Sequence, residues 1–108
     1  MSRDLLPAWA YAAALAALPL QTPQRVRQLI NKGNPAETWM RIVGRQGVLV
    51  KVPNEVQLAW SSSPPDGPMV MYEACQRHSI DVTFHGADGY PETLMGDPFA
   101  PAVLFSQG

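Results

Sequence analysis

Prolines most limit what this chain can fold into, because they divide its first 45 residues into short segments. Proline lacks an N–H and has a fixed φ, so it is tolerated in the first turn of a helix and rarely further inside. Pro7, Pro23 and Pro35 each precede an apolar pattern, which predicts three helices. With 11 Pro and 8 Gly in 108 residues, short elements joined by many turns are expected.

The first predicted helix covers Ala8 to Leu18 and consists almost entirely of Ala and Leu, together with Trp9 and Tyr11. Ala and Leu are strong helix formers, and a helix that is apolar on every side is normally buried. Pro19 ends the predicted helix. We therefore expect a buried helix with Trp9 in the core.

The same apolar run bears on targeting. Between Leu5 and Leu20 it is shorter than an ordinary membrane span. A secretory signal would carry several positive charges ahead of the run, whereas Arg3 is offset by Asp4; the small-residue spacing at Ala14 to Ala16 keeps that alternative open. A single cysteine excludes an intramolecular disulfide and fits a reducing compartment. The prediction is a cytoplasmic protein with no membrane partner.

The next two helices have recognisable start and stop signals. Thr22 and Asn34 are expected N-caps, each followed by a proline, and Gly33 and Gly44 are expected to end the two helices. Glu37 stands where a capping-box partner would be. The predicted core faces consist of Val26, Leu29 and Ile30 in the second helix and of Trp39, Met40 and Val43 in the third.

Two helices joined by residues 19–23 have the layout of a SAM-like or helix-hairpin-helix module. Such hairpins hold a phosphate when glycines let backbone N–H groups approach it closely. Leu20 and Gln21 occupy the positions where those glycines would be needed. A packing role for this hairpin is therefore favoured over a phosphate-binding one.

Charge is divided unevenly along the chain. Residues 1–51 hold seven basic and two acidic residues, a net charge of +5, whereas residues 52–108 hold one basic and seven acidic residues, a net charge of -6. A basic half is compatible with contact to phosphate backbones, although this one is weaker than the footprint of a dedicated DNA-binding protein. Arg25, Arg27 and Lys32 are the candidate DNA contacts; a solvated polar face is the alternative.

The second half begins after a Ser- and Pro-rich segment, 61–68, which predicts a linker. It separates a helical module, 1–60, from the incomplete start of another domain, 69–108. Residues 47–51 are compatible with a strand or a helix tail, and residues 52–60 with a strand or a helical turn. Beyond the linker we expect a helix over 68–78, strands over 80–84 and 102–105, and a helical turn at 92–95. The predicted class is α+β.

The segment from Ser79 onwards resembles the bacterial DNA-processing protein A (DprA/Smf) family. A hydrophobic strand precedes Asp-x-Tyr-Pro-x-x-Leu, followed by Asp-Pro-x-x-Pro-x-x-Leu-Phe-x-x-Gly. The residues that carry the resemblance are Asp88, Tyr90, Pro91, Leu94, Pro101, Leu104, Phe105 and Gly108. Residues 7–45 are more loosely similar to the family's N-terminal helical module, and residues 46–66 are not clearly similar.

The resemblance implies a protein of recombination and natural transformation. Such proteins bind single-stranded DNA and load a RecA-type recombinase onto it without catalysis, through a Rossmann-like domain and a glycine-rich loop beyond the matched segment. Gly108 precedes that loop, so no DNA-binding residue is carried over to this chain, and the surfaces for self-association and RecA contact would lie largely outside it. The chain is then expected to be a fragment of such a protein or a shortened homologue.

The signature residues also have a structural interpretation. Tyr90 before a proline should be extended, and Pro91 should open a helical turn. Leu94, Leu104 and Phe105 are expected to fill an apolar layer, and Asp88 to cap the turn.

Catalysis and metal binding are not predicted. Cys75, His78 and His85 are the nearest approach to a ligand set, but zinc would need further ligands in suitable geometry, and a Cys–His nucleophilic pair would need an orienting group. Residues 86–89 lack the helix and Gly-Lys-Ser/Thr sequence of a phosphate-binding loop. No cofactor is expected. The alternative function is a stand-alone protein-interaction module whose acidic half contacts a partner.

Overall fold

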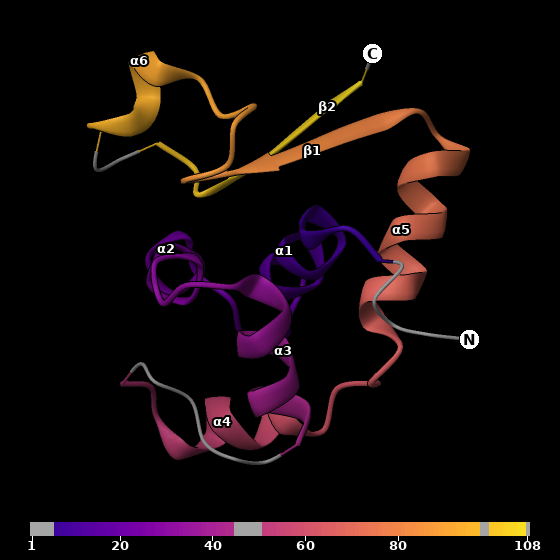
Figure 1. Ribbon diagram of the computed structural model, residues 1–108. Helices are drawn as coiled ribbons and strands as arrows, with labels where there is room; N and C mark the ends of the chain where they lie inside the picture. Colours follow the sequence, from indigo (N-terminus) through magenta and orange to yellow (C-terminus); the bar gives the residue numbers. More distant parts are fainter. Residues whose placement is uncertain (1–5, 45–50, 98–99, 108) are drawn as a thin grey trace.

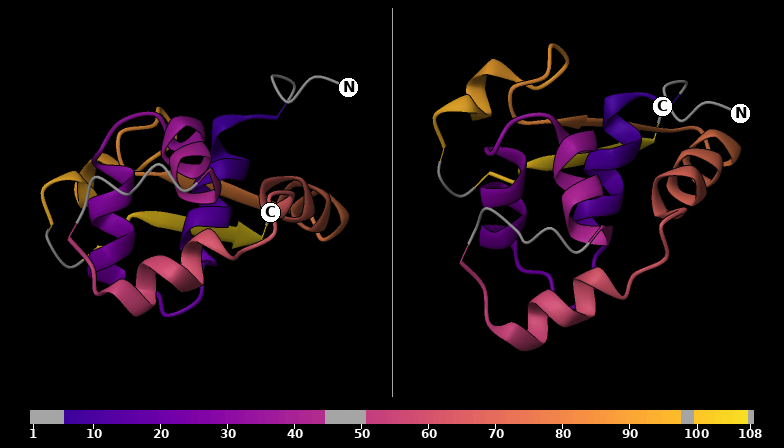
Figure 2. Two further views of the ribbon diagram at one scale, coloured as in Figure 1. Left: turned by 90° about the horizontal axis from the view of Figure 1, so that it is seen from below. Right: turned by 60° about the horizontal axis from the view of Figure 1, so that its bottom comes forward.

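A computed structural model describes residues 6–44, 51–97 and 100–107. Within these ranges it has six helices and two strands, in the order α1 (Ala8–Ala16), α2 (Pro23–Ile30), α3 (Pro35–Val43), α4 (Asn54–Ser61), α5 (Gly67–Arg77), β1 (Ile80–Phe84), α6 (Glu92–Met95) and β2 (Val103–Gln107). The strands form an antiparallel sheet above α1 and α2 (Figure 1). The right-hand view of Figure 2 places α4 on the side away from this sheet. The fold is α+β, as predicted.

Helix α1 is the centre of the molecule. Its residues Ala10 to Leu15 are all buried, and six consecutive residues occupy more than one and a half turns of a helix. Every side of α1 is therefore covered, chiefly by α3, α5 and β1. The alanines explain this position, because their small side chains let several neighbouring elements approach the helix closely.

The predicted caps of α2 and α3 are confirmed. The Thr22 hydroxyl accepts a hydrogen bond from the backbone N–H of Arg25 at 3.1 Å. The Asn34 side chain accepts from the N–H groups of Ala36, at 2.8 Å, and Glu37, at 3.4 Å. The buried residues of these helices are Leu29, Ile30, Pro35, Trp39 and Ile42. Val26, Met40 and Val43 pack partly buried against the same core.

The connection between α1 and α2 is held by its own side chains. Leu20 has a positive φ of 56°, and its carbonyl accepts a 2.7 Å hydrogen bond from Arg25. The Gln21 amide donates to the carbonyl of Leu15 at 2.6 Å, and the Trp60 indole donates to that of Pro19 at 2.7 Å. These contacts agree with a packing role for the hairpin.

Residues 52–60, for which a strand and a helical turn were both compatible with the sequence, lie mainly in α4. A strand and a helix tail were the alternatives for residues 47–51, and all of these except Lys51 lie outside the described residues. The predicted linker, residues 61–68, overlaps the last residue of α4 and the first two residues of α5. Buried residues on both of its sides, such as Trp60 and Val103, belong to one core cluster. The division at residues 61–68 thus falls within a shared core; whether separate domains lie on its two sides stays a prediction.

The sheet pairs Ile80 with Gln107 at one end and Phe84 with Val103 at the other. Rossmann-like sheets are mostly parallel, although mixed sheets often carry an antiparallel edge strand. Burial along β2 decreases from Val103, which belongs to the core cluster, to its exposed last three residues. The prediction that Phe105 fills an apolar layer is therefore wrong, since its side chain is 48% exposed. Leu94 and Leu104 are only half-buried.

Candidate functional site

The residues behind the family resemblance come together in the connection between β1 and β2. Tyr90 is 4% exposed, and its hydroxyl donates a 2.7 Å hydrogen bond to the Pro101 carbonyl. Its ring lies edge-on to His85, with centroids 5.4 Å apart. The backbone N–H of His85 donates to the carbonyl of Ala102 at 2.8 Å, which closes the base of the connection. The segment is thus folded around a buried phenol.

Arg27 attaches this connection to the helical part of the molecule. Its guanidinium nitrogen Nη2 donates to the carbonyl oxygens of Asp97, at 2.8 Å, and Ala100, at 3.0 Å. Figure 1 shows α2 lying beneath the segment that follows α6. A side chain singled out as a candidate DNA contact therefore joins two distant parts of the chain.

The other two candidate contacts are placed differently. Arg25 is half-buried, and its guanidinium donates to the Leu20 carbonyl. Lys32 is exposed in the turn after α2. Since Arg25 and Arg27 are two positions apart, about 200° around the helix, they face different sides. The three side chains do not form one basic surface.

The remaining signature residues have smaller roles. Asp88 is exposed, and no side-chain capping hydrogen bond is present at α6, among the described residues. The expected cap by Asp88 is thus not found at that helix. Pro91 precedes α6 in an extended conformation, with φ -61° and ψ 128°. Gly108 lies outside the described residues.

Cys75, His78 and His85 lie in three different environments. Cys75 is buried, and burial raises the pKa of its thiol. His78 is exposed at the end of α5, whereas His85 is half-buried with Nε2 at 3.1 Å from the Met95 carbonyl oxygen. Within residues 6–44, 51–97 and 100–107, no group of three or more His, Cys, Asp or Glu side chains could hold a metal ion.

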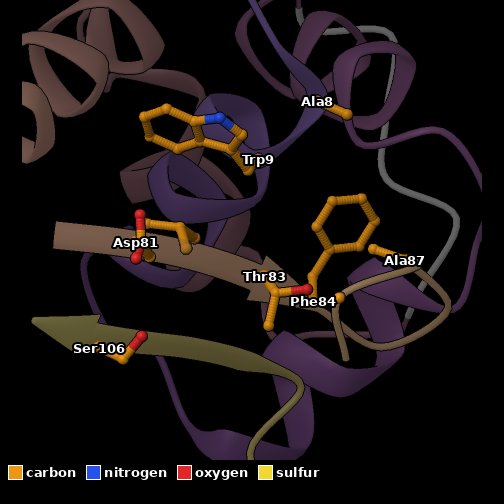
Figure 3. A pocket seen from close by; sticks show the side chains of 9 residues that line it. Ala8, Trp9, Asp81, Thr83, Phe84, Ala87 and Ser106 are labelled. Atoms are coloured by element: carbon orange, nitrogen blue, oxygen red, sulfur yellow. The ribbon is translucent and has the colours of Figure 1, made fainter. Parts of the chain in front are cut away.

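A hollow of about 500 Å³ lies beside β1 and is lined by Trp9 and Asp81 (Figure 3). Trp9 was expected in the core, but it is only half-buried. Its ring stacks on Tyr72 of α5, with centroids 5.4 Å apart and an interplanar angle of 26°. No local pattern could have indicated this pair, because the two residues lie on helices far apart in the sequence.

No protein-family model, curated protein or solved structure matches this chain. Among the helices of the described residues, none is long and apolar enough to cross a membrane.

Proposed function

We propose that the chain is a non-catalytic part of a DprA/Smf-type DNA-processing protein. It supports the DNA-binding domain of that protein structurally and does not itself contain the main DNA-binding site. One observation carries this proposal: the hydroxyl of Tyr90 donates a hydrogen bond to the carbonyl of Pro101, and both are signature residues. They lie in the connection between β1 and β2, which Arg27 of α2 holds by two further hydrogen bonds. Signature residues that are hydrogen-bonded to each other within the chain favour a structural role for this segment over direct contact with DNA.

The environment of the basic residues favours support over direct DNA binding. Two of the three candidate side chains donate hydrogen bonds to backbone carbonyls, which leaves them fewer donors for phosphate oxygens. The α1–α2 connection also has side chains, at Leu20 and Gln21, where a phosphate-binding hairpin would need glycines.

The finer assignments belong to the same proposal. Residues 1–60 would be a SAM-like or helix-hairpin-helix module, and residues 69–108 the start of a Rossmann-like domain whose antiparallel pair lies at the edge of a mixed sheet. By resemblance, the partners of the whole protein would be single-stranded DNA and a RecA-type recombinase, in the cytoplasm, with self-association.

Fluorescence anisotropy with a labelled single-stranded oligonucleotide tests the DNA part of the proposal. We expect weak binding at 50 mM salt that decreases about 7-fold by 200 mM, as two phosphate contacts would give. The double variant Arg25→Ala/Lys32→Ala should abolish it and leaves the Arg27 bonds in place. Arg77→Ala, which removes a basic residue from the acidic half, is the matched control and should change little.

Tight binding at 200 mM salt would contradict a supporting role, because it would require a complete DNA site in this chain. Loss of binding in the Arg77→Ala control would also contradict the assignment to α2 and its following turn.

A stand-alone interaction module is the second candidate. It is favoured by adjacent exposed apolar side chains on α5, Met69 at 39% and Val70 at 54%, and by Leu58 on α4 at 67%. Complete absence of DNA binding at 50 mM salt would favour this function over the first.

A further inference from the structure

The hollow beside β1 brings together side chains that the proposed function does not use. It measures about 500 Å³, and its lining comes from α1, from β1 with the turn that follows it, and from Ser106 of β2. Figure 3 shows the Trp9 ring above β1, with Asp81 on the strand below it and Ser106 on the neighbouring strand. The site therefore combines an aromatic surface, a carboxylate and a hydroxyl.

Trp9 provides the aromatic surface of the hollow. Tyr72 stacks on the Trp9 ring and so covers one face of the indole. Trp9 is nevertheless only half-buried and lines the hollow, so part of its ring remains accessible. Stacking also limits the movement of the indole, which lowers the entropy lost when a ligand packs on it. Tryptophan is the side chain whose ring attracts cations most strongly.

The charge around the hollow favours a positive ligand. Asp81 is exposed, and the backbone pairs it with Ser106, so the carboxylate and the hydroxyl lie on adjacent strands. The described residues that line the hollow include no Lys, Arg or His. The surrounding half of the chain, residues 52–108, has a net charge of -6. A phosphate would be repelled here, which separates this site from any DNA contact.

We propose that this hollow binds an arginine side chain of a partner protein. A guanidinium is the cation that fits both features, because it stacks on an aromatic ring and also pairs with a carboxylate through two parallel hydrogen bonds. A lysine ammonium is a compact charge that cannot make the paired contact. The site holds the partner through Trp9 and Asp81, and it does so independently of the DNA-processing function.

Titration of the whole chain with N-acetyl-arginine methylamide, followed by NMR, tests this proposal. The indole N–H of Trp9 and the backbone N–H of Asp81 should shift in a saturable way, whereas those of the buried Trp39 and Trp60 should not. The citrulline analogue has nearly the same shape without the charge, and it should shift them much less. Equal shifts with both probes, or none with arginine, would overturn the proposal.

Two variants with the same change in net charge then locate the contact. Asp81→Asn should weaken arginine binding about two- to five-fold, the range of an exposed ion pair. Glu55→Gln removes an exposed carboxylate on α4 that does not line the hollow, and it should leave the affinity unchanged. Equal weakening in both variants would indicate general attraction to an acidic protein and would overturn the site. Trp9→Phe keeps a ring to stack on Tyr72 and should also weaken binding.

A second copy of this chain is the competing occupant, since its residues 1–51 are basic. Shifts at Trp9 that grow with protein concentration alone, without any probe, would show that a second copy fills the hollow, and they would overturn the assignment to a separate partner.

Discussion

At the scale of single residues, Arg27 connects α2 to the segment between α6 and β2 through hydrogen bonds. Its removal should therefore destabilise the protein. Arg27→Ala deletes two charge-assisted hydrogen bonds to carbonyls, one exposed and one partly buried. We expect a loss of about 1 to 2 kcal/mol in the free energy of unfolding, measured by urea denaturation. Lys32→Ala is the control and should stay within about 0.5 kcal/mol of the parent. Equal losses in both variants would contradict the structural role of Arg27.

Cys75 gives a second prediction at this scale, because burial raises the pKa of its thiol. Only the thiolate reacts with a disulfide reagent, so the folded protein should react more slowly than the urea-unfolded chain at every pH between 7 and 9. Because the pKa of the Cys75 thiol is higher in the folded state, its burial contributes stability that is fully present below the unfolded-state pKa. That contribution is lost as the pH rises through the folded-state pKa. Similar rates in the folded and unfolded chains would contradict this burial.

The sequence indicated Arg27 as a polar position of α2 but could not indicate its partners. The periodicity of Val26, Leu29 and Ile30 defines which face of the helix is buried. The carbonyls that accept from Arg27 belong to Asp97 and Ala100, on a segment that comes close only when the whole chain is folded. The charge pattern of the first half was compatible with a DNA contact for Arg27 and equally with a solvated polar face, and neither interpretation includes these carbonyls.

At the scale of elements, α5 begins at Gly67, where the Trp39 ring of α3 lies against the backbone. A Cβ atom at Gly67 would lie 2.9 Å from Trp39 Cη2 and 3.0 Å from Cζ2. Trp39 is 3% exposed, and its indole donates to the Pro65 carbonyl at 3.4 Å, so the ring has little freedom to move. Gly67→Ala should thus destabilise the fold by about 1 to 3 kcal/mol in thermal or urea unfolding.

Gly96→Ala is the matched control, because a Cβ there would meet nothing within 4 Å. Its effect should be small. An unchanged stability of Gly67→Ala would contradict the tight contact between α5 and α3.

The beginnings of α2 and α3 were predictable from the sequence, whereas the type of α4 was not. The Thr22 and Asn34 caps are local chemistry, readable from adjacent residues. In residues 52–60 the apolar residues Val56, Leu58 and Trp60 alternate as in a strand, yet Val56 and Trp60 also have helical spacing. The helix buries those two and leaves Leu58 67% exposed. The choice between the strand period and the helix period therefore depends on packing against the rest of the chain, which the local sequence does not contain.

At the scale of the whole molecule, α1 belongs to both halves of the chain. Its buried surface is covered by α3 from one side of residues 61–68 and by α5 and β1 from the other. We expect a single cooperative unfolding transition, with coincident curves from far-ultraviolet circular dichroism and from tryptophan fluorescence. Two separate transitions would contradict a shared core.

A fragment of residues 1–66 tests the same point more directly. It lacks α5 and the sheet, so the apolar surface of α1 would face water, and we expect a poorly dispersed NMR spectrum without cooperative unfolding. A folded fragment would instead support an independent domain before the predicted linker. The fold class was predictable from element types, but the antiparallel pairing and the exposure of Phe105 depend on contacts between segments that are distant in the sequence.

The central position of α1 has a consequence for the order of events during protein synthesis. This helix leaves the ribosome before α3, α5 and β1, the elements that surround it. At roughly 5 to 20 residues per second, the chain between α1 and β2 takes on the order of 5 to 20 seconds to be made. Throughout that time an Ala- and Leu-rich segment has no complete covering, so nascent chains of this protein should depend on holding chaperones until β2 emerges.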